Sequence, residues 1–156
     1  MARFDLSRAS ELVRRARLDA GLAQSELARR AGIRQPSLAQ IESGTRGISD
    51  EMLERILKAA DYRPSLPLAE LADSIATAAG RHGLSNVRVF GSTVRGEDHF
   101  DSDIDLLVTP SSSTDLFDLA LFANEVRELT GFHADVIVDA ELSLASDSST
   151  LEAVPL

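Results

Sequence analysis

The chain has 156 residues and a mass of 16.8 kDa, enough for one average domain or two small ones. Hydrophobic residues make up 44% of it and charged residues 26%, a globular composition that excludes a disordered chain. Because the chain has no cysteine, disulfide bonds, thiolate zinc sites and cysteine nucleophiles are excluded.

The net charge of −9 is divided unevenly along the chain. Residues 1–63 hold 12 Lys and Arg against 9 Asp and Glu, a net of +3, whereas residues 64–156 hold 4 against 16, a net of −12. This asymmetry favours two surfaces with different partners: the basic half suits phosphates and the acidic half suits cations. Two differently solvated surfaces with no such partners are the alternative.

No apolar run approaches the ~18 residues that a membrane span needs. The segment 1–17 is rich in arginine and lacks the apolar stretch of a secretory signal. We therefore expect a cytoplasmic protein with no membrane partner.

Apolar side chains in residues 1–63 follow a helical period and predict four or five short helices. The stripes are Leu12, Val13, Ala16 and Leu18, then Leu27, Ala28 and Ala31, then Leu38 and Ile41, then Leu53, Ile56 and Leu57. Ser49, followed by Asp50 and Glu51, is typical of a capped helix start.

Pro64 and Pro67 mark a boundary, because proline removes a backbone donor and disfavours helix in the residue before it. The domains are therefore predicted as 1–63 and 64–156. In the second, the pattern predicts helix over Leu68–Ala79, strands over Val87–Phe90 and Ile104–Val108, helix to Thr130 and strand over Ala134–Val138. Pro110 is expected to end the second strand, Ser113 or Thr114 to cap the following helix, and residues 143–150 to form a loop. This alternation indicates an α/β layer.

The stretch from Leu22 to Gly44 has a pattern suited to two helices joined by a tight turn at Gly32. Within residues 8–61 the chain resembles the Xre/Cro helix-turn-helix family, which implies an all-α bundle that binds DNA. Ala23 and the run Arg34-Gln35-Pro36 stand where this family often has Ser or Thr, so helix capping is expected to be weak.

The resemblance places one helix in the major groove, where glutamine and arginine side chains recognise base edges. The residues expected to contact DNA are Gln24, Arg34, Gln35, Ser37, Gln40, Thr45 and Arg46, with Gln24 on phosphate and Thr45 and Arg46 on the backbone. A helical bundle used for protein contacts is the alternative.

Asp103 and Asp105 are two residues apart on a predicted strand, so both carboxylates project from one face while Ile104 points into the core. Two such charges repel unless a cation lies between them, and oxygen ligands suit Mg²⁺ or Mn²⁺. Gly91-Ser92 follows the preceding strand and allows phosphate to approach the backbone. Asp135 on the third strand completes a set of three carboxylates. His82, His99 and His133 are interpreted as surface or core residues, not ligands.

The Gly-Ser pair, the spacing and the Asp-Ile-Asp sequence resemble the motif of the nucleotidyltransferase superfamily that includes DNA polymerase β. Over residues 66–140 the chain is similar to its minimal members, which implies a small α/β domain with a mixed sheet. The resemblance implies that Asp103, Asp105 and Asp135 hold the metal ions and are catalytic, with Asp135 as the base. It also implies that Gly91, Ser92 and Arg95 bind the nucleotide, with ATP as the donor. A decayed fold that binds nucleotide weakly is the alternative.

The fusion of these two domains resembles the antitoxin of a prokaryotic toxin–antitoxin pair. The resemblance implies that the chain transfers AMP to a partner toxin, such as a HEPN-domain ribonuclease, and regulates its own operon as a homodimer on operator DNA. One alternative is a transcription regulator whose transferase fold only senses nucleotide or docks a toxin. Another is nucleotide transfer to a small molecule.

Overall fold

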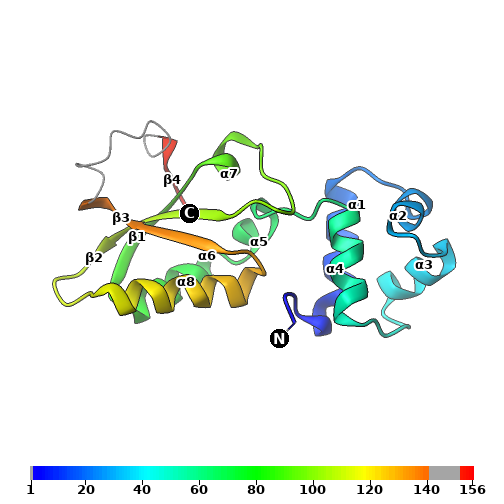
Figure 1. Cartoon of the computed structure of the whole chain (residues 1–156), viewed down its shortest axis with the longest axis horizontal. Helices are drawn as coiled ribbons and strands as arrows, with labels where there is room; N and C mark the ends of the chain where they lie inside the picture. The colour runs from blue at the N-terminus through cyan, green and yellow to red at the C-terminus, as the bar shows by residue number, and fades with distance from the viewer. Residues whose placement is uncertain (1, 141–151) are drawn as a thin grey trace. The chain divides into compact units, whose positions relative to one another are not determined.

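The computed structural model describes residues 2–140 and 152–156. The chain forms two compact units, Met1–Arg63 and Pro64–Leu156 (Figure 1). The loop predicted at 143–150 lies outside the described residues. Among the described residues, no helix has both the length and the apolar character of a membrane span.

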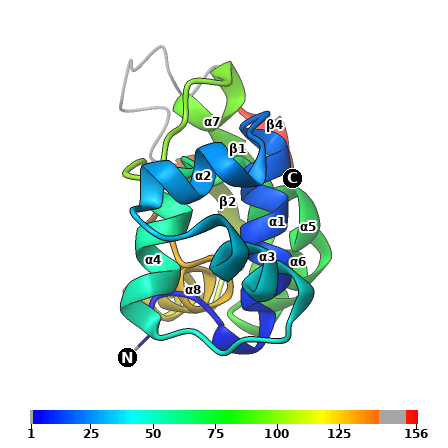
Figure 2. The same cartoon turned by 90° about the vertical axis from the view of Figure 1, so that its right-hand side faces the viewer.

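The first unit is all helical, as the sequence predicts. Its elements are the 3-10 helix η1 (Leu6–Arg8) and the α-helices α1 (Ala9–Asp19), α2 (Gln24–Ala31), α3 (Gln35–Ser43) and α4 (Asp50–Ala59). Helices α1 and α2 each pack against both α3 and α4 (Figure 2). The predicted apolar stripes form the core except for Leu18, which is 58% exposed because it does not lie on the face of α1 that Ala9, Leu12, Val13 and Ala16 bury.

Capping in this unit follows the sequence closely. The Ser49 side chain accepts a hydrogen bond from the Met52 amide and caps α4. In contrast, the N-cap residues of α2 and α3 are Ala23 and Arg34, and neither side chain makes a capping hydrogen bond, as expected from those residue types. Gly32 ends α2 with φ of +71°, a left-handed conformation that glycine adopts without strain.

An ion pair between Arg17 and Glu42 joins α1 to α3. The Arg17 Nε donates to Glu42 Oε1 at 2.9 Å, and the two side chains are only 16% and 5% exposed. Gln24, at the start of α2, donates to the other Glu42 oxygen at 2.6 Å. A single carboxylate therefore connects three helices, and it needs both donors because an unpaired buried charge is costly.

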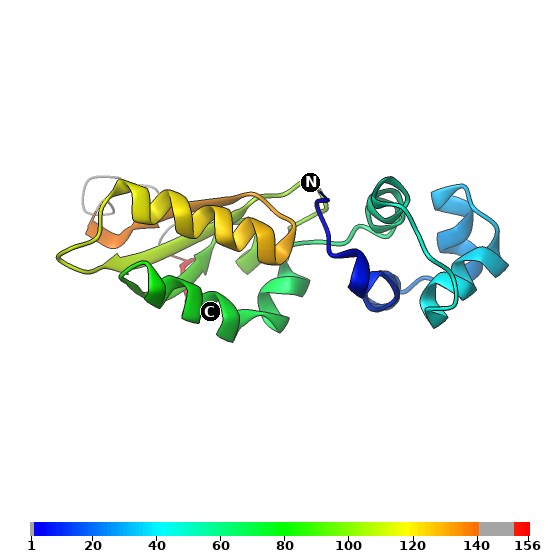
Figure 3. The same cartoon turned by 90° about the horizontal axis from the view of Figure 1, so that it is seen from below.

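The second unit is a four-stranded mixed sheet with helices. Its elements are α5 (Ser65–Glu70), α6 (Ala72–Arg81), β1 (Leu84–Phe90), α7 (Ser92–Arg95), β2 (Ile104–Pro110), α8 (Leu116–Thr130), β3 (Ala134–Val138) and β4 (Val154–Pro155). The strand order is β3-β2-β1-β4, with β2 and β3 parallel and the other pairs antiparallel. Helices α6 and α8 lie side by side along the sheet (Figures 1 and 3). The predicted mixed α/β class is confirmed.

Several predicted boundaries in this unit were wrong. The single helix expected over 68–79 is two helices that meet at Leu71. Strand β2 continues through Pro110, which pairs with Leu84, because β1 begins earlier than expected. The cap of α8 is Asp115, which exchanges hydrogen bonds with Asp118 in a capping box, and neither Ser113 nor Thr114 has that role. The short elements α7 and β4 were not predicted.

The loop that leads into β2 is held by a buried carboxylate. Asp98 is 2% exposed and accepts hydrogen bonds from the Ser65 amide at 2.8 Å and the Ser65 hydroxyl at 2.6 Å. Because Ser65 begins α5, these bonds join that helix to the residues just ahead of β2. The start of β2 is therefore held both by its pairing with β1 and β3 and by the hydrogen bonds between Asp98 and Ser65.

Replacing Arg17 with leucine is expected to lower the free energy of unfolding of the helical unit by on the order of 2–4 kcal/mol, because Glu42 would stay buried without its cation. Chemical denaturation followed by helical circular dichroism measures this change. Arg14→Leu on the same helix, where the side chain is exposed, is the control and should stay within about 0.5 kcal/mol of wild type. Equal effects of both substitutions would contradict this account of the ion pair.

Candidate functional site

The parallel pairing of β2 with β3 determines which polar side chains meet. Asp105 lies opposite Asp135, and Ile104 lies opposite Ala134. Continuing this register one residue back places Asp103 beside His133, since side chains alternate along each strand. Ile104 and Ala134 are buried and point away from this row. The start of the two strands thus presents three carboxylates and one imidazole on a single face.

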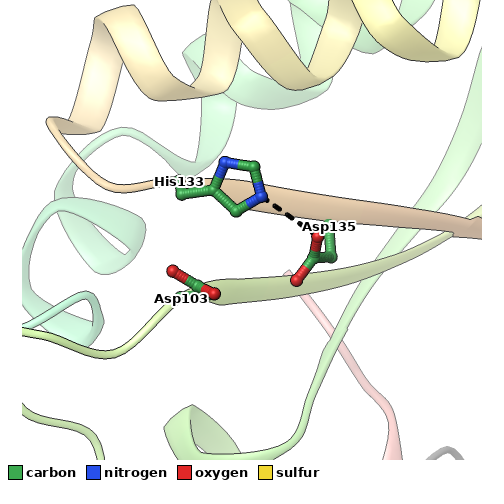
Figure 4. Close-up of side chains that lie close together, drawn as sticks. All are labelled: Asp103, His133 and Asp135. Carbon is green, nitrogen blue, oxygen red and sulfur yellow. Dashed lines mark hydrogen bonds and ion pairs between the residues drawn. The ribbon is translucent and has the colours of Figure 1, made fainter.

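The ligand atoms of Asp103, His133 and Asp135 all lie within 4.8 Å of one another, and all three side chains are exposed (Figure 4). The His133 Nε2 is 3.1 Å from Asp135 Oδ1, within hydrogen-bond distance. His133 is a surface residue, as the sequence indicated, but it lies beside the carboxylates, a position that the sequence analysis did not predict. The signal in the sequence was its position two residues before Asp135, which puts both on one strand face.

Asp105 is the least exposed of the three aspartates. Burial raises its pKa above the ordinary value of 3.8, and the negative charges of Asp135 and Asp103 raise it further. The nearby Arg95 guanidinium acts in the opposite direction. The carboxylate row is therefore electrostatically strained without a cation, which would relieve the repulsion.

Gly91 lies directly against Asp105. It has φ of +79° and ψ of −150°, a backbone region open essentially to glycine alone. A Cβ at this position would clash with Asp105 Oδ2 and lie 3.4 Å from its Cγ. Glycine is therefore required both by the backbone angle and by the closeness of the carboxylate, and Ser92 follows it as the first residue of α7.

Arg95 ends α7 and is held by two glutamates. Its Nε donates to Glu97 Oε2 at 2.9 Å and its Nη1 donates to Glu152 Oε2 at 3.3 Å. These hydrogen bonds, that of Glu97 above all, raise the pKa of Arg95 further, so the guanidinium stays charged. An anion that reached Arg95 would compete with these two exposed carboxylates.

The donor set at the strand starts fits a divalent cation. Asp103, Asp105 and Asp135 supply the oxygen ligands that Mg²⁺ and Mn²⁺ bind, and His133 adds a nitrogen. Asp103, His133 and Asp135 are exposed, so their ligand atoms are accessible from solvent.

In the helical unit, the predicted DNA-contact residues gather around the starts of α2 and α3. Gln35 donates from Nε2 to Gln24 Oε1 at 3.1 Å, and Gln24 is itself bonded to Glu42. This chain fixes the amide orientation of Gln35, whose side chain is exposed. A fixed amide at the start of a helix can pair with an adenine edge.

The remaining predicted contacts follow α3 and the loop after it. Arg46 donates to the Ser37 hydroxyl at 2.9 Å, and Thr45 donates to the Gln40 carbonyl at 3.3 Å. Arg34 and Gln40 are exposed. The structure therefore brings all seven predicted residues to one helix pair and its following loop.

Comparison with known proteins agrees with both halves of this arrangement. Residues 13–66 match the family described as helix-turn-helix, and residues 71–155, more than half of the chain, match the family described as nucleotidyltransferase domain. The chain therefore belongs to the nucleotidyltransferase family and carries an Xre-type helix-turn-helix DNA-binding domain ahead of that domain.

Two similar proteins each match part of this chain. A protein of Methanocaldococcus jannaschii, whose name provisionally assigns it as a protein adenylyltransferase, is 37% identical over 57 residues. The match covers 36% of this chain and 61% of that protein, so the chain spans about three fifths of its relative's length. A solved structure described, also provisionally, as a minimal nucleotidyltransferase is 35% identical, with a TM-score of 0.51 over 59% of this chain and 95% of that one.

In the absence of metal and at neutral pH, Asp105→Asn is expected to raise the melting temperature of the protein by roughly a few degrees. With the pKa of Asp105 raised in the folded state, unfolding becomes easier as pH rises from 3.8 through the raised value. Asparagine does not ionise, so the variant does not lose this stability. It should therefore be more stable than wild type above the raised pKa and equally stable near pH 3.8 and below.

Thermal melts in a chelator across this pH range measure the difference. Asp101→Asn, at an exposed aspartate in the preceding loop, is the control and should follow wild type at every pH. A stabilisation by Asp105→Asn that is the same at low and neutral pH would contradict the electrostatic explanation.

Proposed function

We propose that the second domain transfers AMP from ATP to a hydroxyl of a partner protein, a toxin, and that the first domain binds operator DNA of the same operon. The observation that carries this proposal is the meeting of Asp103, Asp105 and Asp135 in register at the starts of β2 and β3, beside Gly91. The provisional name of the archaeal relative supports a protein as the acceptor.

In this proposal the residues of the site have distinct roles. Asp103, Asp105 and Asp135 would hold divalent ions, Mg²⁺ or Mn²⁺, which would supply charge neutralisation at the phosphate. Gly91 and Ser92 hold the triphosphate close to the strand ends, and Arg95 exchanges its glutamate partners for a phosphate. Asp135, which is half-exposed, accepts the proton of the attacking hydroxyl.

The reaction balances without a further reactant. The acceptor oxygen forms a bond to the α-phosphorus, the bond from that phosphorus to the bridging oxygen breaks, and pyrophosphate leaves with the electron pair. Electrostatic stabilisation of the charge that develops on the phosphate oxygens supplies most of the acceleration.

DNA binding in this proposal uses a homodimer. One recognition helix contacts too few base pairs for useful affinity, so two copies on a palindromic operator are required. Arg34, Gln35, Ser37 and Gln40 contact bases, while Gln24, Thr45 and Arg46 contact the backbone. The partner toxin we favour is a HEPN-domain ribonuclease encoded beside this chain.

Transfer of label from α-labelled ATP to the product of a neighbouring HEPN-like reading frame tests the enzymatic proposal. Asp103→Asn and Asp105→Asn should each reduce labelling on the order of a hundredfold or more, because each removes charge stabilisation at the phosphate. Asp101→Asn is the matched control and should label at the wild-type rate. If wild type labels no protein while still binding DNA, a regulator with an inactive transferase fold replaces the proposal.

The DNA contacts predict two different losses. Gln35→Ala should cost about 1–3 kcal/mol on the operator and little on random duplex, since it removes a base contact. Arg46→Ala should weaken binding to both sequences and reduce the salt dependence by about one phosphate contact. Titration of each variant against operator and random DNA at several salt concentrations separates the two. The assignment would be overturned if Arg46→Ala abolished the preference for operator over random DNA while Gln35→Ala retained it.

A further inference from the structure

The His133 side chain has a place in the site that the chemistry above does not use. It precedes β3 by one residue and shares a strand face with Asp135, whose Oδ1 lies 3.1 Å from the His133 Nε2. Its ring points toward the carboxylates at the two strand starts (Figure 4). The side chain is 59% exposed, so packing does not require an imidazole at this position.

The separations suit a shared ion. A metal with bonds of about 2.1–2.2 Å holds neighbouring ligand atoms about 3 Å apart and opposite ones a little over 4 Å apart in octahedral geometry. The 3.1 Å between His133 and Asp135 matches a neighbouring pair, and Asp103 completes a set within 4.8 Å. Small rotations of three exposed side chains would bring the set onto one ion.

The donor chemistry distinguishes the ions that such a set prefers. Mg²⁺ binds oxygen ligands and keeps much of its water, whereas first-row transition ions also accept an imidazole nitrogen. A set made of carboxylates alone discriminates less between Mg²⁺ and a transition ion than a set that includes a nitrogen ligand. A nitrogen in the set adds affinity for the transition ion and very little for Mg²⁺.

We propose that His133 is a nitrogen ligand of this site and tunes it for a first-row transition ion such as Mn²⁺ over Mg²⁺. This inference rests on the proposed function, because it concerns the ion that the same carboxylates hold. On ion binding the Nε2 lone pair goes to the metal and the imidazole proton resides on Nδ1, so the contact with Asp135 becomes one between two neighbouring ligands.

The other two histidines of the chain offer a comparison. The His82 Nε2 lies 2.9 Å from Glu125 Oε2, its ring is tilted against that of Phe122, and it does not belong to the cluster of Asp103, His133 and Asp135. His99 is an exposed residue of the loop ahead of β2 and belongs to no metal-ligand cluster found among the described residues. His99→Gln therefore removes an imidazole from the same domain and serves as the matched control.

Titration of the full chain with Mn²⁺, followed by electron paramagnetic resonance, tests this assignment directly. Wild type and His99→Gln should give a nitrogen coupling to bound Mn²⁺ in pulsed spectra. His133→Gln should lose that coupling and bind Mn²⁺ roughly tenfold more weakly, while competition with Mg²⁺ should report a change below about twofold in Mg²⁺ affinity.

Other results would overturn the inference in recognisable ways. Tight Mn²⁺ binding with no nitrogen coupling in wild type would show a carboxylate-only site, even if His133→Gln weakened binding by releasing Asp135. Unchanged Mn²⁺ affinity in His133→Gln would also overturn it. Neither result would contradict the proposed function. A wild-type protein that binds neither Mn²⁺ nor Mg²⁺ and labels no protein would contradict both the proposed function and the inference about His133.

Discussion

The register between β2 and β3 is the constraint on which the second domain depends. It sets Asp105 opposite Asp135 and brings Asp103 to His133, so charges distant in sequence occupy one small area. Repulsion among these groups disfavours the folded state, as the raised pKa of Asp105 indicates. The sheet withstands it because Ile104, Leu106 and Val108 are fully buried on the opposite face of β2 and fix the register.

The surrounding elements position groups around this row. Gly91 allows β1 to end against Asp105, and Asp98 holds the loop ahead of β2 through Ser65. In the helical unit a different carboxylate, Glu42, organises the structure by binding Arg17 and Gln24, and through Gln24 it orients Gln35. Each domain thus relies on one acidic centre, neutralised in the first by protein donors and in the second by a cation under the proposed function.

Local patterns were sufficient to predict most of the fold, while pairing between strands was not. Helical periods, the cap at Ser49 and the Gly-Ser and Asp-Ile-Asp motifs depend on neighbouring residues, so the sequence contains them directly. The position of His133 depends on which strand pairs with β2 and in what register. The break at Leu71, the continuation of β2 through Pro110 and the Asp115 cap likewise depend on tertiary partners that outweigh local preference.

Under the proposed function, the carboxylate row holds a divalent ion next to a nucleotide. Anomalous diffraction at the manganese edge, from crystals grown with Mn²⁺ and a non-hydrolysable ATP analogue, tests it most directly. We expect a manganese peak bounded by Asp103, Asp105 and Asp135, with the triphosphate beside Gly91 and Ser92. A bound nucleotide with no metal peak at the starts of β2 and β3 would contradict it.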